Sequence, residues 1–394
     1  MWFPRHFSER LRDVALHFPA VVLTGARQVG KSSLLRREFP QHAYVSLDVP
    51  STAELAERDP TAFFARHPPP VLVDEVQYAP GVFRAVKVLI DADRHAMGRF
   101  ILTGSQRFAL MNEVSESLAG RCAVLELDGL SAAELMGAGM DAASRFVEVL
   151  TRGSFPELWR DPEMPSDVFY ASYLATYLER DVRQLLNVGS LRDFERFVRA
   201  CAARSAQALN KSDLARDVGI SPTTAGEWLS VLVTSGQVSL LEPWFTNVGK
   251  RLVKTPKLYL RDTGLLSWLL GLSASDFERS PYRGAVFETW VHGELHKRLA
   301  DMPHVLTYYR DQQNREVDFV VDRGGRLALF EAKLTEQPSS RDAAGLETVA
   351  KLLRERSGPP LDVDLQALVS RPQTDHPLAG GQQVVHAARV SNLL

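Results

Sequence analysis

Several features that would place a protein in a special class are scarce in this sequence. Among 394 residues there are two cysteines, Cys122 and Cys201, whose wide spacing argues against both a disulfide framework and a cysteine zinc site. The first residues mix charges into an apolar pattern and so lack the uninterrupted core of a signal peptide. No apolar run approaches the roughly 18 residues of a membrane-spanning helix. These absences predict a cytoplasmic protein without a membrane partner.

An excess of one charge is missing as well. The chain has 46 lysines and arginines against 48 aspartates and glutamates, a formal net charge of -2. There is therefore no overall attraction to nucleic acid, and a contact with DNA would need a local basic surface. With 45% hydrophobic residues the composition is ordinary for a globular protein, and the length allows two or three domains.

The first part of the chain alternates apolar runs with helical patterns. The runs are VVLT (21–24), AYVSLD (43–48), VLVDE (71–75), FILTGS (100–105) and AVLELD (123–128). Such alternation is typical of parallel strands joined by helices. We therefore expect one doubly wound α/β domain over residues 1–140.

The first run leads into GARQVGKS, residues 25–32, which fits GxxxxGK[ST] and lies between a strand and a helix as that pattern requires. The glycines let backbone N–H groups turn toward phosphate oxygens. Lys31 is expected to neutralise the β and γ phosphates, and the Ser32 hydroxyl to ligate Mg²⁺. The expected nucleotide-binding residues are Gly25, Ala26, Arg27, Gln28, Val29, Gly30, Lys31, Ser32 and Ser33.

Two acids end the run VLVDE, which we expect beside the P-loop strand. Asp74 is expected to hold Mg²⁺, and Glu75 to orient and deprotonate the attacking water. An acid directly after the Mg²⁺ acid, with the extra strand AYVSLD before it in the chain, is typical of ATPases that carry their own catalytic base. It is not typical of GTPases or small-molecule kinases.

Polar residues end the run FILTGS, where a sensor for the γ-phosphate would lie. They are Thr103, Ser105 and Gln106. The same residues would also suit an ordinary hydrogen-bonded turn, so both interpretations stay open.

Residues 141–275 have a helical pattern, and within them residues 196–262 predict a winged helix-turn-helix. Two short helices meet at Gly219, with Ser221 as N-cap and Pro222 in the first helical position of the second. VSLLEPW and KLYLRD then predict a two-stranded wing.

The charges of this module favour weak or nonspecific contact with DNA. The second helix carries Ser221, Thr223, Thr224, Glu227 and Trp228, with no lysine or arginine for phosphates or guanine edges. The wing region has Lys250, Arg251, Lys254 and Lys257, which would suit phosphate contacts. A solvated hairpin face is the alternative.

The last part, residues 276–394, predicts a third, mixed α/β unit. Asp318 and the sequence Glu331-Ala332-Lys333 lie on successive strands, and alternation places Glu331 and Lys333 on one side. Two carboxylates can hold Mg²⁺ or Mn²⁺, and a lysine beside them can activate water. Glu288, on the preceding helix, would complete the metal shell.

Two resemblances follow from these motifs. The motifs that carry the first are TGARQVGKSSLL, YVSLDVP, VLVDEVQYAP, LTGSQRFALM, SLAGR and TYLERDV. Over nearly its whole length the chain resembles the bacterial and archaeal AAA-type ATPase family with a C-terminal DUF4143 region. The order of Glu288, Asp318 and the ExK sequence along helix and strands resembles the PD-(D/E)xK nuclease fold. The second resemblance implies either a metal-dependent nuclease or an inactive, DNA-binding version, and a chance match of exposed strand charges is the remaining alternative.

The first resemblance implies an ATP-binding and ATP-hydrolysing core. It also implies that Arg121, in SLAGR, or Arg180, in TYLERDV, meets the γ-phosphate from the same or a neighbouring subunit, as in ring assemblies. Pairing of these arginines with nearby acids is the structural alternative. A second copy of the chain is thus a candidate partner.

Three functional hypotheses follow. The first is an ATPase that drives or gates a DNA transaction. The second is a nucleotide-dependent regulatory or protein-interaction switch with an inactive C-terminal domain. The third is a nuclease in which ATP binding is structural. Stimulation of ATP hydrolysis by DNA, indifference to DNA, and cleavage without ATP would distinguish them.

Overall fold

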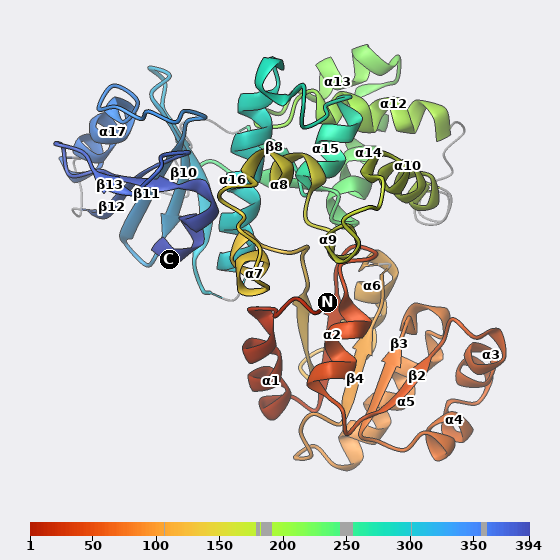
Figure 1. The fold of residues 1–394 in the computed structure, drawn as a ribbon. Coiled ribbons are helices and arrows are strands. Elements are labelled where there is room, and N and C mark those ends of the chain that lie inside the picture. The colour runs from red at the N-terminus through yellow and green to blue at the C-terminus, as the bar shows by residue number, and fades with distance from the viewer. Residues whose placement is uncertain (106, 179–181, 183–190, 245–254, 301, 356–360) are drawn as a thin grey trace. The chain divides into compact units, whose positions relative to one another are not determined.

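The computed structural model describes residues 1–105, 107–178, 182, 191–244, 255–300, 302–355 and 361–394 (Figure 1). These residues form two compact units. The first comprises Met1–Leu130, Phe155–Asp161 and Thr234–Gly236, and the second comprises Ser131–Ser154, Pro162–Val233 and Gln237–Leu394. Among the described residues, none of the helices combines the length and apolar character needed to cross a membrane.

The first unit is built on a five-stranded sheet in the order β2-β3-β4-β1-β5, with every neighbouring pair parallel. Its strands are β1 (Ala20–Thr24), β2 (Ala43–Ser46), β3 (Val71–Asp74), β4 (Phe100–Thr103) and β5 (Cys122–Glu126). Its helices are α1 (Phe7–His17), α2 (Lys31–Glu38), α3 (Pro50–Arg58), α4 (Pro60–Arg66), α5 (Gly81–Ala92), α6 (Arg107–Ser117) and α9 (Pro156–Arg160). The predicted parallel α/β fold is confirmed.

The strand order corrects one expectation. The strand that ends in Asp74 does not lie beside the P-loop strand β1, because β4 separates β3 from β1. Burial explains the order: all residues of β1, β3 and β4 are buried, as central parallel strands are, whereas the first two residues of β2 are exposed at an edge.

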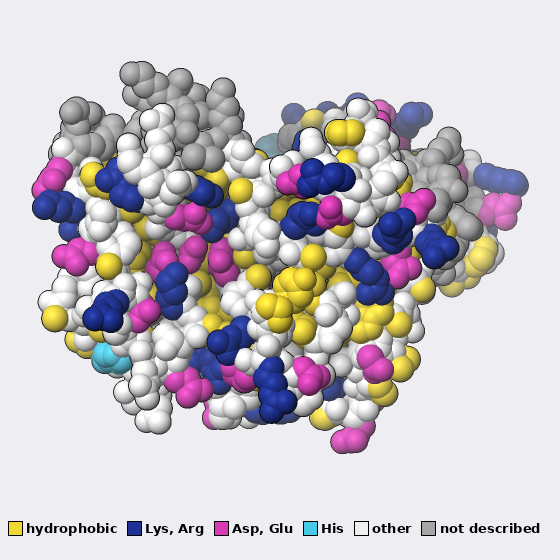
Figure 2. Space-filling view, turned by 90° about the horizontal axis from the view of Figure 1, so that it is seen from above, with side chains coloured by type: hydrophobic (Ala, Val, Ile, Leu, Met, Phe, Trp, Pro, Cys, Tyr) yellow, Lys and Arg dark blue, Asp and Glu magenta, His cyan; other side chains and the backbone are white. Residues whose placement is uncertain are grey.

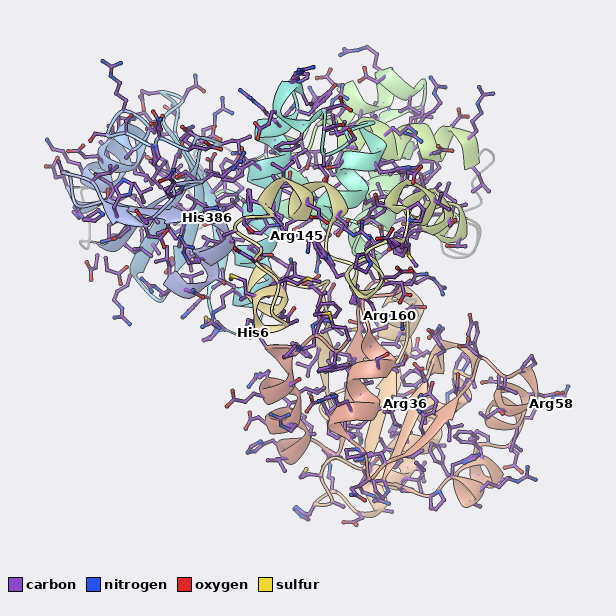
Figure 3. The ribbon with its side chains drawn as sticks, in the orientation of Figure 1. His6, Arg36, Arg58, Arg145, Arg160 and His386 are labelled. Carbon is purple, nitrogen blue, oxygen red and sulfur yellow. The ribbon has the colours of Figure 1, made fainter. Side chains whose placement is uncertain are left out.

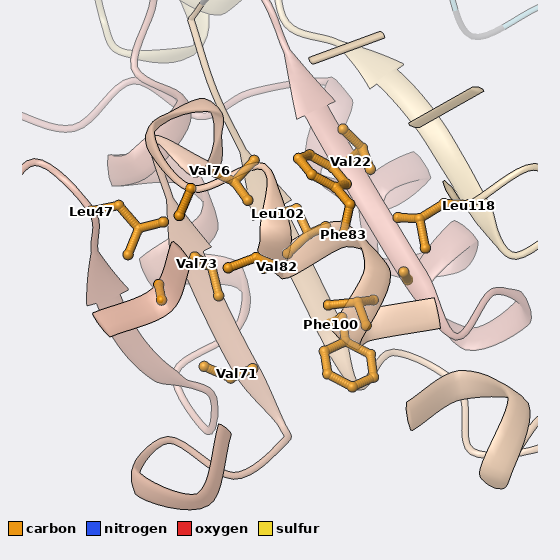
Figure 4. Close-up of a cluster of buried hydrophobic side chains, with 14 of the residues drawn as sticks. Val22, Leu47, Val71, Val73, Val76, Val82, Phe83, Phe100, Leu102 and Leu118 are labelled. Atoms are coloured by element: carbon orange, nitrogen blue, oxygen red, sulfur yellow. The ribbon is translucent and has the colours of Figure 1, made fainter. Parts of the chain in front are cut away.

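One apolar cluster holds this sheet to its helices. Val22, Val73, Phe100 and Leu102 of the sheet and Phe83 of α5 are fully buried in it (Figure 4). Each such side chain stabilises the fold by roughly 1.5–3 kcal/mol. This cluster makes the sheet a rigid base for the loops that follow its strands.

The second unit begins with a helical part. It contains α7 (Ala132–Gly137), α8 (Phe146–Arg152), α10 (Ser166–Tyr177), α12 (Leu191–Ala202), α13 (Lys211–Val218), α14 (Pro222–Thr234) and α15 (Thr263–Leu269). A small antiparallel sheet accompanies them in the order β6-β8-β7, made of β6 (Gln207–Ala208), β7 (Val238–Leu241) and β8 (Lys257–Leu260).

Helices α13 and α14 meet where the sequence predicts. Gly219 takes a left-handed backbone with φ 84°, and the Ser221 hydroxyl accepts a hydrogen bond from Thr224 N at 3.0 Å. Pro222 is the first residue of α14. The local signals of the turn therefore determine the helix ends.

The rest of the second unit is a six-stranded mixed sheet in the order β13-β14-β12-β11-β10-β9. The strands are β9 (Val305–Arg310), β10 (Glu316–Asp322), β11 (Arg326–Ala332), β12 (Asp362–Ser370), β13 (His376–Pro377) and β14 (Gln383–His386), with helices α16 (Arg283–Leu299) and α17 (Ala344–Arg354). β9, β10 and β11 are antiparallel, and β12 runs parallel to β11. The register slips between Val317 and Val320, where β10 carries a bulge.

Candidate functional site

The loop from β1 to α2 has the backbone of a phosphate-binding turn. Gly25, Gln28 and Gly30 all have positive φ, at 138°, 63° and 95°. Such left-handed turns direct successive N–H groups into one concavity, where they bind anions. A positive φ at Gln28, which is not glycine, is the kind of strain that occurs at functional sites.

Gly25 has no room for a side chain. A Cβ at this position would lie 2.2 Å from the backbone oxygen of Leu127. That backbone is itself fixed, because Leu127 N donates to Thr24 O at 2.9 Å. The loop therefore packs against the segment after β5 through bare backbone.

Lys31 is the first residue of α2 and its side chain is buried. Its ammonium donates to Gly25 O at 2.9 Å and Ala26 O at 2.8 Å, so it closes the loop upon itself. Neutral carbonyls are weaker partners for an ammonium than phosphate oxygens. Ser32 follows half-buried, and Ser33 is exposed.

Arg5 is a site residue that sequence reasoning missed. Its guanidinium donates to Val29 O at 2.9 Å, within the P-loop, and to Asp128 O at 2.5 Å and Gly129 O at 3.3 Å, beyond β5. The side chain thus joins two segments far apart in the sequence. A lone arginine in an apolar stretch, MWFPRHF, was the available signal.

Asp74 is the last residue of β3 and is buried. Tyr44 of β2 donates its hydroxyl to Asp74 Oδ2 at 2.8 Å, and Arg36 lies over the Tyr44 ring at 4.8 Å, with Figure 3 showing Arg36 on α2. Burial, with the hydrogen bond and charge of Asp74, raises the pKa of Tyr44 to about 12. The phenol therefore remains a donor at neutral pH. Sequence reasoning missed Tyr44.

Glu75 follows with a left-handed backbone, φ 54°. Its Oε2 accepts hydrogen bonds from the Gln77 side chain, from Ser105 N at 3.3 Å and from Ser105 Oγ at 3.2 Å. Ser105, predicted as a sensor, thus contacts the predicted catalytic base. Gln77 was not predicted.

Thr103 ends β4, between the P-loop strand and the strand of the two acids. Its Oγ1 is buried and has no hydrogen-bond partner among the residues that the structure describes. A buried hydroxyl without a partner costs about 1–3 kcal/mol, so it favours a ligand that would satisfy it. The carboxyl ends of parallel strands share one edge of a sheet. The residues that gather at that edge are Lys31, Asp74, Glu75, Thr103 and Ser105.

Arg121 lies elsewhere. It precedes β5, whose first residue pairs with the first residue of β1, so it lies at the edge of the sheet opposite the P-loop, roughly 15 Å away. Its guanidinium forms a bidentate pair with Asp91 at 2.8 and 2.9 Å, which lowers the pKa of that carboxyl. Arg180 and Gln106 lie outside the described residues.

The structure brings the four predicted C-terminal residues together. Asp318 lies in the bulge of β10, and its Oδ2 accepts from Ala332 N of β11 at 3.0 Å. Lys333 pairs with Glu331 Oε1 at 2.8 Å. Bulges are common next to functional sites because they re-aim side chains. Yet the residues that the structure describes contain no group of three or more His, Cys, Asp or Glu placed to hold a metal.

Lys257 lies among these carboxylates, and it corrects an expectation. Predicted as a phosphate contact in an exposed wing, its side chain is 5% exposed, and its ammonium lies 3.0 Å from Glu288 Oε1, 2.6 Å from Glu316 Oε1 and 3.3 Å from Asp318 Oδ1. Its strand β8 is the middle strand of the small sheet, so a neighbour lies on each side. Lys250, Arg251 and Lys254 lie outside the described residues.

The charges of this cluster are strongly coupled. Burial, and then the charge of Asp318, raises the pKa of Glu288 to about 7, although Lys257 and the Tyr259 hydroxyl oppose the shift. Burial alone would lower the pKa of Lys257, but the nearby carboxylates outweigh it and raise that pKa. The ammonium therefore stays charged at any physiological pH.

One side chain of the second helix of the helix-turn-helix belongs to the core. Trp228 is buried against Phe194 and Phe197, with ring centroids 5.2 and 5.6 Å away. Thr223 and Glu227 remain exposed on α14. On the face drawn in Figure 2, the coloured Lys and Arg side chains are interspersed with Asp and Glu, without forming one basic field.

Three known families match the chain. An AAA domain matches residues 17–136, a domain of unknown function, DUF8612, matches residues 143–276, and another, DUF4143, matches residues 283–389. The uncharacterized proteins Rv2008c of Mycobacterium tuberculosis and Mb2031c of Mycobacterium bovis are each 36% identical over 340 residues, covering 85% of this chain and 75% of theirs.

Solved structures that resemble the chain include the Walker-type ATPase PABY2304 of Pyrococcus abyssi and a RuvB variant of Thermotoga maritima. The first has 17% identity and a TM-score of 0.43, and the match covers 68% of this chain and 96% of that one. The second has 16% identity and a TM-score of 0.30, and the match covers 60% of this chain and 89% of that one.

Proposed function

Because the chain belongs to the family of AAA-type ATPases with a C-terminal DUF4143 domain, we propose that it binds ATP with Mg²⁺ and hydrolyses the nucleotide. We assign this activity to a domain of residues 1–140. One observation carries the proposal: a left-handed P-loop, two adjacent acids and the Thr103 hydroxyl, which has no partner within the described part of the chain, gather at one sheet edge.

Each residue has a role in this proposal. The N–H groups of the P-loop and the Lys31 ammonium bind the phosphates. Ser32 and Asp74 would hold Mg²⁺, which lowers the negative charge on the phosphates. Glu75 orients a water molecule and takes its proton, and Thr103 and Ser105 sense the γ-phosphate. Ser105 already contacts Glu75, so a γ-phosphate bound there would compete for the same hydroxyl.

Two variants test these roles. Lys31→Ala is expected to abolish nucleotide binding, whereas Glu75→Gln is expected to retain binding and slow hydrolysis about 10²–10⁴-fold. Fluorescent ATP titrations and phosphate release measure the two properties. Glu54→Gln, at an exposed acid on α3, is the matched control. Equal loss of binding in Lys31→Ala and Glu75→Gln would contradict the assignment.

An arginine from a neighbouring subunit would complete the site. Arg121 lies at the opposite end of the sheet from the P-loop and is paired with Asp91, a position that supports a role only across a subunit boundary. If it has that role, Arg121→Ala blocks hydrolysis while Asp91→Ala does not. A chain that sediments as a monomer with and without ATP would remove this role.

We further infer that hydrolysis is coupled to DNA through a winged helix within residues 196–262. The support is the order α12, β6, α13, α14, β7 and β8, with the Gly219 turn between the two central helices. DNA is then expected to stimulate ATP hydrolysis, with binding that weakens as salt rises. The test is the hydrolysis rate with and without duplex DNA over a salt series.

A second candidate is a nucleotide-dependent switch that binds another protein. The composition of α14 favours it, because that helix has no lysine or arginine and its Trp228 is buried. Stable ATP binding with a hydrolysis rate indifferent to DNA would support this candidate and contradict the first.

We also propose that the C-terminal domain, which we take as residues 276–394, is a PD-(D/E)xK-like module. Its α16, antiparallel β9, β10 and β11, then α17 and the parallel β12 support that kinship. Nuclease activity would require Mg²⁺ or Mn²⁺ near Glu288, Asp318 and Glu331. Cleavage of DNA without ATP that is lost in both Asp318→Ala and Lys333→Ala would establish it, and unchanged cleavage would refute it.

A further inference from the structure

The C-terminal acidic site already contains a cation. We call Glu288, Glu316 and Asp318 the carboxylate cluster. The Lys257 ammonium makes one contact with each of them, at 3.0, 2.6 and 3.3 Å. A lysine ammonium has three N–H donors. Every donor therefore has a carboxylate oxygen as its partner.

Two tyrosines contact this site, one at the ammonium and one at its carboxylate partner. The Tyr308 ring centroid lies 5.5 Å from Lys257 Nζ, within the range of a cation–π interaction. The Tyr259 hydroxyl donates to Glu288 Oε1 at 2.7 Å, the oxygen that Lys257 also contacts. The ammonium thus has three carboxylates and one aromatic ring as neighbours.

The backbone of Lys257 is fixed as well. It pairs with Ala208 of β6 on one side and Leu241 of β7 on the other. Two residues before it, Thr255 O accepts from the Tyr308 hydroxyl at 2.5 Å. The start of β8 is therefore tied to the C-terminal sheet, and Lys257 can leave the cluster only by rotation of its side chain.

A divalent metal does not fit beside this lysine. Mg²⁺ requires oxygen ligands at about 2.1 Å in near-octahedral order, and Ca²⁺ requires six to eight oxygens. Lys257 engages one oxygen of each of the three carboxylates, and Asp318 Oδ2 accepts a hydrogen bond from Ala332 N. A dication at the same place would also be repelled by the ammonium.

We propose that Lys257 is a built-in cation that replaces the divalent metal of the nuclease-like site and closes the carboxylate cluster to metals. The lysine comes from a strand of the helix-turn-helix part, whereas its partners come from α16 and β10. The cluster therefore joins β8 to the C-terminal sheet by charge. This inference rests on the proposed kinship of the C-terminal domain and is independent of the ATP site.

Removal of the charge at constant length tests the proposal. Lys257→Met is made in the full chain with Asp74→Asn, which removes the acid proposed to hold Mg²⁺ at the ATP site, and the probe is Mn²⁺ without nucleotide. Lys297→Met is the matched control, since Lys297 pairs with Glu294 at 2.7 Å and its side chain is 14% exposed. Thermal unfolding and Mn²⁺ electron paramagnetic resonance provide the readouts.

Mn²⁺ is expected to leave the melting temperature of the Asp74→Asn parent unchanged. Lys257→Met is expected to melt several degrees lower, to gain a Mn²⁺ site about tenfold or more tighter than any in the parent, and to regain stability with Mn²⁺. Asp318→Asn should remove the gained site. Lys297→Met should show no Mn²⁺ rescue.

Two results would overturn the proposal. One is a Mn²⁺ site in the parent that Asp318→Asn removes and Lys257→Met does not change. The other is a Lys257→Met variant as stable as the parent and without Mn²⁺ affinity. If Lys257→Met does not fold, Glu316→Gln is added: recovery of folding supports the counter-ion role, and failure to recover refutes it. ATP binding, measured in the same variants with Asp74 intact, reports separately on the proposed ATPase.

Discussion

Gly25→Ala is expected to damage the P-loop by an amount that follows from its surroundings. The added Cβ would lie 2.2 Å from Leu127 O, about 1 Å inside the closest normal carbon–oxygen contact. Overpacking of this kind costs about 1–3 kcal/mol. A φ of 138° adds a further 1–3 kcal/mol or so for a residue with a side chain. The expected total is roughly 2–6 kcal/mol, a large part of a typical stability of about 5–15 kcal/mol.

Gly120→Ala is the matched control in the same unit. Gly120 also has a left-handed φ, 71°, but no atom of the described residues lies within 4 Å of its added Cβ, so only strain of about 1–2 kcal/mol is expected. Both variants change the unfolded chain alike, so that contribution cancels. Hydrogen exchange of β1 and β5 in urea measures local stability, and fluorescent ATP measures binding. If Gly25→Ala matches Gly120→Ala in protection and still binds ATP, the packing argument fails.

Two further changes probe other contacts. Trp228→Ala removes an indole packed on Phe194, so we expect the helix-turn-helix part to lose about 3–5 kcal/mol of unfolding free energy in urea. The control Thr223→Ala, at an exposed position, should change that free energy by no more than about 0.5 kcal/mol. Equal effects would mean that the indole is not a core residue. Tyr44→Phe deletes the hydrogen-bond donor to Asp74. It should raise the Mg²⁺ concentration that gives half-maximal hydrolysis about tenfold and leave ATP binding without Mg²⁺ unchanged. An unaltered Mg²⁺ dependence would show that Tyr44 does not position Asp74.

The sequence predicted what is local. The P-loop, the two acids at the end of β3 and the Gly219 turn each occupy a few consecutive residues, and their backbone requirements appear directly as residue types. The order of the strands could not be predicted from such short segments. The placement of β4 beside β1 depends on the burial of both faces of β4 within the whole sheet.

Lys257 shows the limit most clearly. In the sequence it is one of several basic residues in a wing, and nothing nearby indicates burial. Its partners Glu288 and Asp318 lie 31 and 61 residues further along the chain. The contact between Lys257 and these two carboxylates follows from tertiary packing. The charge pattern of the sequence therefore suggested an exposed Lys257, whereas the structure has a buried one. Tyr44 was missed for the same reason, since it is 30 residues from Asp74.

The contact between Arg5 and the P-loop has a practical consequence for anyone purifying the protein. An affinity tag placed ahead of Met1 would lie four residues before Arg5, whose guanidinium donates a hydrogen bond to Val29 O. Such a tag can disturb the conformation of the phosphate-binding turn. Nucleotide affinities measured on such fusions should therefore be repeated after tag removal.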